Sequence, residues 1–235
     1  MEKKLTDLFD RLKEAPKDRL VSVILYGSGA GGDHVEKFSD LNVMCVLTGI
    51  TASDLARSEP IFIWWRQLGN PAPLLMSESE VRTSTDCFTI EFHDMQERRR
   101  VLCGKDVIAD LVIDRSFYRA QVENELRAKL IRLRQKAGHV LSDGKALLRL
   151  MLDSVSTFCV LARHAILLSG GEAGWQKRDI VKKLGELGAD PAPFRTLLDL
   201  REQKKDDTTV DPLTLFEGYL KQIEAMVAHV DRLEK

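Results

Sequence analysis

Two apolar segments joined by a short glycine-rich stretch constrain the fold of this chain most strongly. Residues 20–26 and 41–48 are apolar enough to form strands that are buried on both faces of a sheet. The first segment runs directly into Gly27 and Ser28, and the second begins just after Asp40. Backbone N–H groups at a glycine turn suit an anion such as phosphate. The pattern predicts a phosphate cradle beside a carboxylate.

The segments around this pair alternate between helical and strand signals. Apolar residues at helical spacing predict a helix over 2–14, and Thr51 is placed to cap another helix that runs to Gln67. Residues 73–76 favour a short strand and residues 78–82 a short helix. The N-terminal part of the chain is therefore predicted to be a mixture of strands and helices.

Residues 87–93 alternate apolar and polar side chains. Phe88, Ile90 and Phe92 share one set of positions, whereas Glu91 lies in the other set. A period of two predicts a strand with one core face and one polar face. Glu91 would then project from the polar face, where it is available to a functional site.

The pattern becomes helical almost throughout after about residue 113. The predicted helices cover 116–137, 144–168, 176–187, 191–204 and the segment from Pro212 to the C-terminus, with the proline at the first helical position. We therefore predict an α/β domain over 1–113, followed by an antiparallel helical bundle over 114–235.

Composition restricts the classes of partner. The net charge of −1 opposes bulk attraction to nucleic acid or to an anionic membrane. No uninterrupted apolar run reaches the roughly 18 residues of a membrane span, and the N-terminus does not read as a signal peptide. The four cysteines are scattered without metal-binding spacing. These features predict a cytoplasmic protein that does not bind a membrane.

Two familiar phosphate motifs fit the glycine turn poorly. Gly27 to Gly32 matches the dinucleotide fingerprint in form, but the next strand follows after only a short spacer, and its end at residues 46–48 carries no acid. A P-loop needs a lysine after its last glycine, and Asp33 occupies that place. The dinucleotide interpretation stays as a minor alternative, and the P-loop is rejected.

A strand, a Gly-Ser turn, a spacer and an aspartate that opens a second strand together resemble the nucleotidyltransferase superfamily. Its familiar members are DNA polymerase beta and kanamycin nucleotidyltransferase, and this chain is most similar to the small bacterial two-domain members. The resemblance implies an α+β fold with a mixed sheet, flanking helices and a C-terminal helical bundle. It also implies Mg²⁺ or Mn²⁺ as cofactor and a nucleoside triphosphate as substrate.

The resemblance also implies roles for individual residues. Gly27 and Ser28 would hold the triphosphate, and Asp40 and Glu91 would be catalytic carboxylates that ligate metal. Asn42 departs from the pattern, because a second carboxylate is expected there; its amide oxygen would be a weak metal ligand that also contacts the nucleotide. Three consecutive arginines, 98–100, follow, and Arg99 is the predicted triphosphate contact.

Asn42 leaves two hypotheses open. In the first, the chain transfers a nucleoside monophosphate to a hydroxyl acceptor, which is a small molecule, an RNA end or a protein. In the second, the domain is catalytically degenerate and serves only to bind a nucleotide or a partner protein. In either case, a partner protein or a second copy of the chain would bind through the helical bundle.

Overall fold

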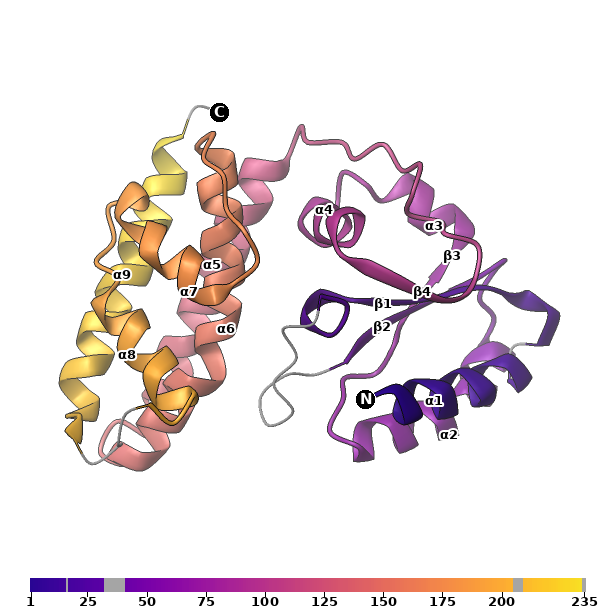
Figure 1. Cartoon of the computed structure of the whole chain (residues 1–235), viewed down its shortest axis with the longest axis horizontal. Helices are drawn as coiled ribbons and strands as arrows, with labels where there is room; N and C mark the ends of the chain where they lie inside the picture. The colour runs from indigo at the N-terminus through magenta and orange to yellow at the C-terminus, as the bar shows by residue number, and fades with distance from the viewer. Residues whose placement is uncertain (16, 32–40, 205–208, 234–235) are drawn as a thin grey trace. The chain divides into compact units, whose positions relative to one another are not determined.

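The computed structural model describes residues 1–15, 17–31, 41–204 and 209–233. The chain divides into two compact units, Met1–Phe117 and Tyr118–Lys235. The first unit contains a four-stranded sheet with helices on both sides, and in the second unit the described residues form helices and their connections (Figure 1). The predicted α+β class is confirmed.

The sheet is mixed, with strand order β3-β2-β1-β4. Strand β1 (Leu20–Tyr26) pairs antiparallel with β2 (Asn42–Leu47) on one side and with β4 (Arg99–Gly104) on the other. The edge strand β3 (Leu74–Ser77) runs parallel to β2. Strand β1 therefore lies between β2 and β4. Its last residue, Tyr26, is paired with Asn42 on β2 and with Arg99 on β4.

Helices cover both faces of the sheet (Figure 1). They are α1 (Glu2–Glu14) and α2 (Ala52–Gln67) on one face, and α3 (Glu78–Thr83) and α4 (Thr89–Glu97) on the other. Alternate residues of β1 divide between the two cores: Val23 and Leu25 pack toward α1 and α2, whereas Ile24 packs toward α3 and α4. A strand buried on both faces was the sequence prediction for residues 20–26, and it is confirmed.

Side-chain caps explain where several helices begin. The Thr51 hydroxyl accepts from the Asp54 N–H at 3.3 Å, and the Asp54 carboxylate accepts from the Thr51 N–H at 2.9 Å. Ser77 and Glu80 form the same reciprocal pair at the start of α3. Asp211 caps the last helix just before its proline, as the sequence predicts.

The predicted strand over residues 87–93 is wrong, because Thr89–Glu97 forms helix α4. Phe88 and Phe92 are one helical turn apart and make an edge-to-face contact at 6.5 Å. Met95, three residues further on, is fully buried in the same core. A short apolar run can satisfy both a period of two and helical spacing, and here the packing against the sheet favours the helix. The strand in this region is β4 instead.

The second unit is a helical bundle. Its helices are α5 (Tyr118–Ala137), α6 (Gly144–Leu168), α7 (Lys177–Lys182), α8 (Ala192–Arg201) and α9 (Pro212–Arg232), with a 3-10 segment over Lys183–Leu187. Tyr219 lies at the centre of an aromatic cluster, with ring centroids 4.9 Å from Phe194 and 5.8 Å from Phe158. By length and composition alone α6 could span a membrane, but 56% of its most apolar window is buried inside the protein, as in a core helix.

A buried side chain anchors the start of β2. The Leu41 N–H donates to Oδ1 of Asn70 at 3.1 Å, and Asn70 lies in the link between α2 and β3. Leu41 immediately precedes Asn42, so this hydrogen bond fixes the backbone on which Asn42 is carried. Asn70 is therefore a structural support for the end of the sheet.

We predict that Asn70→Ala destabilises the protein by about 1–3 kcal/mol, because the buried Leu41 N–H loses its acceptor. Urea unfolding of the two proteins measures this difference. Gln67→Ala is the control: Gln67 is exposed on the same part of the chain, and its replacement should change stability by no more than about 0.5 kcal/mol. Equal effects from the two substitutions would show that Asn70 does not anchor β2.

Candidate functional site

The glycine turn ends β1 and takes the chain out of the sheet. Gly27 has φ of +72°, in the left-handed region that favours glycine, and it opens the 3-10 turn Gly27–Gly29. A Cβ at Gly27 would lie 3.3 Å from Nδ2 of Asn42. Gly27 and Asn42, two of the residues that the sequence assigns to the nucleotide, are therefore neighbours in space.

Tyr26, just before the turn, lies in a row of three residues across the sheet. It is paired with Asn42 on β2 and with Arg99 on β4. Directly opposed residues of antiparallel strands project from the same face. Tyr26 packs with the core that contains Phe92, so this is the face covered by α4.

Glu91 is carried by helix α4. It lies in the first turn of the helix and is exposed. Burial raises the pKa of the Tyr26 phenol, and the negative charge of Glu91 raises that pKa further. The Glu91 charge therefore acts at the Tyr26 hydroxyl. The sequence predicted Glu91 on a strand, and this is wrong because Glu91 lies on helix α4; its place at the site stays a prediction.

Arg98 lies against the backbone of the turn. Its guanidinium donates to the carbonyl oxygen of Gly31 at 2.6 Å. A Cβ at Gly31 would lie only 1.9 Å from Cζ of Arg98, so only glycine leaves room for the guanidinium at this point. A positive charge is thus held beside the end of the Gly-Ser turn.

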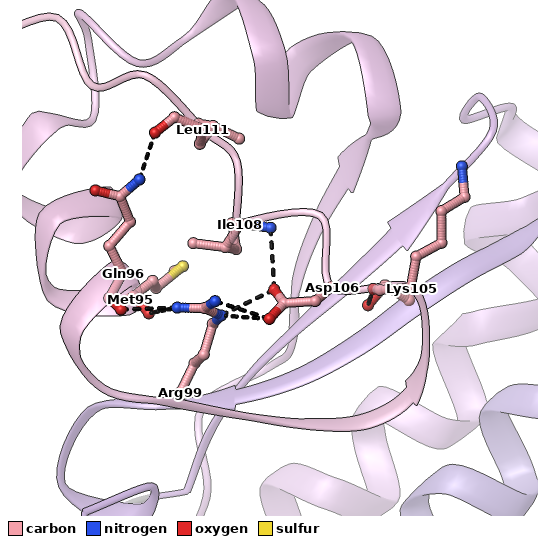
Figure 2. A network of polar contacts seen from close by, with 8 residues as sticks. Met95, Gln96, Arg99, Lys105, Asp106, Ile108 and Leu111 are labelled. Atoms are coloured by element: carbon pink, nitrogen blue, oxygen red, sulfur yellow. Dashed lines mark hydrogen bonds and ion pairs between the residues drawn. The ribbon is translucent and has the colours of Figure 1, made fainter.

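Arg99, the predicted triphosphate contact, is held by hydrogen bonds to other residues of the protein (Figure 2). Its guanidinium pairs with both carboxylate oxygens of Asp106, at 2.7 and 2.8 Å. It also donates to the carbonyl oxygens of Met95 and Gln96 at the end of α4. All three guanidinium nitrogens therefore have partners within the protein, which ties β4 to α4 and to the segment that follows β4. Contact between Arg99 and a nucleotide stays a prediction that this geometry does not favour.

The side chains of two predicted ligands, Asp40 and Ser28, lie outside what the structure describes. Asp40 lies outside the residues that the structure describes, and only the backbone of Ser28 is described, within the 3-10 turn. Gly27 and Asn42 are neighbours at the end of β1, Tyr26 is paired with Asn42, and the charge of Glu91 acts on Tyr26.

The donors at this end of the sheet suit a hard cation. Asn42 offers an amide oxygen and Glu91 a carboxylate, and Mg²⁺ and Mn²⁺ both accept oxygen ligands of these kinds. Asn42 is half-buried and Glu91 is exposed. Asp40, two residues before Asn42, would add a second carboxylate.

No protein-family model matches the sequence, and no curated protein sequence matches it either. Solved structures do match. One is the crystal structure of spectinomycin adenyltransferase AAD(9) from Enterococcus faecalis with ATP and spectinomycin, with a TM-score of 0.64 and 11% sequence identity. The match covers 99% of this chain and 100% of that chain. The chain has a nucleotidyltransferase fold.

Reasoning from the sequence did not single out two residues beside the glycine turn, Tyr26 and Arg98. Tyr26 carries a signal, because it directly precedes Gly27 and closes the strand. Arg98 was considered only as one of three arginines, and its position depends on the carbonyl of Gly31, which is 67 residues away in sequence. A contact over that separation leaves no local pattern.

We predict that Glu91→Gln lowers the pKa of Tyr26, because removing the negative charge favours the phenolate. Titration of the tyrosinate absorbance, with Tyr26→Phe to identify the relevant phenol, measures the shift. Since folding raises this pKa, the folded state holds the proton more tightly than the unfolded state. Stability should therefore be unaffected below pH of about 10 and should fall as pH rises through the raised pKa.

The matched control is Glu97→Gln, which removes a carboxylate from the other end of α4. It should leave the titration of Tyr26 unchanged. If Glu91→Gln also leaves the titration unchanged, Glu91 does not lie at the end of β1.

Proposed function

We propose that this chain is a metal-dependent nucleotidyltransferase that transfers a nucleoside monophosphate from a nucleoside triphosphate to a hydroxyl acceptor. One observation carries the proposal: Gly27 and the side chain of Asn42 are adjacent where β1 ends, next to Tyr26, on which the charge of Glu91 acts. This adjacency supports a site in which a glycine turn suited to phosphate would lie beside oxygen ligands for a cation. The shared fold with an adenyltransferase supports the same activity.

Each residue has a defined part in this proposal. The Gly27 turn and Ser28 bind the triphosphate, and the guanidinium of Arg98 stabilises its negative charge from beside Gly31. Asp40, Asn42 and Glu91 would hold Mg²⁺ or Mn²⁺. When bound, the cation would neutralise phosphate charge and polarise the acceptor.

The proposed transfer exchanges one bond at the α-phosphorus for another. The acceptor oxygen forms a bond to the α-phosphorus, and the bond from that phosphorus to the pyrophosphate oxygen breaks. The hydroxyl proton passes to a carboxylate of the site, for which Asp40 and Glu91 are the candidates. The products are the nucleotidylated acceptor and pyrophosphate.

We propose a small hydroxylated molecule as the acceptor. The similar AAD(9) structure contains ATP together with spectinomycin, which is a small molecule. The net charge of −1 on this chain gives no general attraction for a long RNA. An RNA end and a protein hydroxyl stay alternatives that an acceptor screen would distinguish.

Asn42 favours one second candidate, nucleotide binding without catalysis. An amide in place of a carboxylate removes one negative charge from between the proposed metal ligands, and a two-metal arrangement needs that charge. The two candidate functions use the same proposed site at the end of β1 and differ in whether pyrophosphate is released.

We predict that Mg²⁺ or Mn²⁺ with ATP raises the melting temperature of the protein, and that Asp40→Ala abolishes the increase because the metal loses a carboxylate. At a ligand concentration about 100 times Kd, binding should contribute about 2.7 kcal/mol of stability. Differential scanning fluorimetry with each of the four nucleoside triphosphates measures the effect and identifies the preferred base.

The control is Asp10→Ala, which removes an exposed carboxylate from α1 and should leave the increase intact. Absence of a shift with every combination of nucleotide and metal would contradict both candidate functions. A shift that persists in Asp40→Ala would place the nucleotide elsewhere.

Asn42→Asp tests whether the amide limits the chemistry. We predict tighter Mn²⁺ binding, measured by isothermal titration calorimetry, and faster pyrophosphate release, because the substitution adds a carboxylate next to the Gly27 turn. Asn42→Ser, which keeps an oxygen but adds no charge, should produce neither gain. Equal behaviour of the two variants would show that charge at this position is not limiting.

A further inference from the structure

Helix α2 carries an apolar groove on its outer surface. Six of its residues line a groove of about 490 Å³: Leu55, Ala56, Glu59, Phe62, Ile63 and Arg66. Leu55 and Ile63 are each 50% exposed, a large fraction for aliphatic side chains on one helix. A separate stripe on the same helix, which includes Ile61 and Trp65, is buried against the sheet. Phe62 is half-buried, because part of its side chain packs against that same core, while Leu55 and Ile63 stay open to solvent.

Two opposite charges line the same groove. Glu59 and Arg66 are both exposed, and neither side chain makes a hydrogen bond or ion pair with any residue of the described ranges. Other charged side chains of this helix do pair: Arg57 contacts Asp54 at 2.9 Å. The groove therefore combines exposed apolar surface with a carboxylate and a guanidinium that are both available to a partner.

The arrangement is self-complementary. Glu59 lies three residues before Phe62, and Arg66 lies three residues after Ile63, so the charges are symmetric about the point between the two apolar residues. All four lie on one face, because residues three, four and seven apart on a helix share a side. A second α2, antiparallel and related by a two-fold axis at that point, would place Glu59 of each copy opposite Arg66 of the other.

We propose that this chain forms a two-fold symmetric homodimer through α2. The central contact is Phe62 and Ile63 against the same residues of a second copy, and two Glu59–Arg66 pairs flank it. Closed two-fold dimers use one patch twice, which requires the self-complementarity seen here.

The charge order favours a second copy over an unrelated protein. An unrelated partner has no need for an acid and a base placed symmetrically about an apolar centre, whereas a two-fold partner does. The sequence alone placed an interface on the helical bundle, but α2 belongs to the first unit. The proposal concerns a surface separate from the Gly27 turn and stands independently of the proposed activity.

Charge reversal tests the pairing by sedimentation velocity on the full chain. Glu59→Arg and Arg66→Glu should each raise the dimer dissociation constant at least about tenfold, because like charges then face each other twice. Mixing the two variants should restore association. One variant then presents two cations and the other two anions, so both flanking pairs reform across a heterodimer.

The matched controls reverse the same residue types on other exposed helical positions, Glu14→Arg on α1 and Arg132→Glu on α5. They should leave the dissociation constant unchanged. The proposal is overturned if the original chain stays monomeric up to its solubility limit. It is also overturned if the original chain dimerises but the single reversals do not weaken association, or if their mixture does not recover it.

Discussion

Strand β1 is the constraint on which the rest of the site depends. It is hydrogen-bonded along both edges and buried on both faces, so its position is fixed in every direction. Its last residue, Tyr26, is level with Asn42 on one neighbour and with Arg99 on the other. The chain can then leave the sheet only through a sharp turn, which Gly27 provides with a positive φ. The glycine turn and the side chain of Asn42 thus meet where β1 ends, at the place where we propose that phosphate binds.

The charged and polar groups of the proposed site come from different elements. The Glu91 carboxylate lies in the first turn of a helix, and Asn42 carries an uncharged amide. The positive charge near the turn comes from Arg98, which the Gly31 carbonyl holds in place, while Arg99 is used to join β4 to α4. A site with fewer anions than a two-metal arrangement needs binds a cation more weakly, so nucleotide phosphates would have to supply part of the charge.

Local signals in the sequence predicted most of the fold. Long apolar or strongly periodic segments such as residues 20–26 and 144–168 have only one way to bury their surface, and caps such as Thr51 mark helix starts. The strand prediction for residues 87–93 was wrong, because so short a segment fits both a period of two and helical spacing. Packing against the sheet favours the helix. The turn and Asn42 were recognisable from spacing, but the partners of Arg98 and Arg99 depend on contacts that tertiary structure creates.

The most direct test of the account is a crystal structure with Mn²⁺ and a non-hydrolysable ATP analogue, in which anomalous scattering locates the metal. The account predicts triphosphate against the backbone of Gly27 and Ser28, and manganese bound by oxygens that include those of Asn42 and Glu91. Nucleotide and metal at any other place in the chain, or a metal that contacts neither residue, would contradict it.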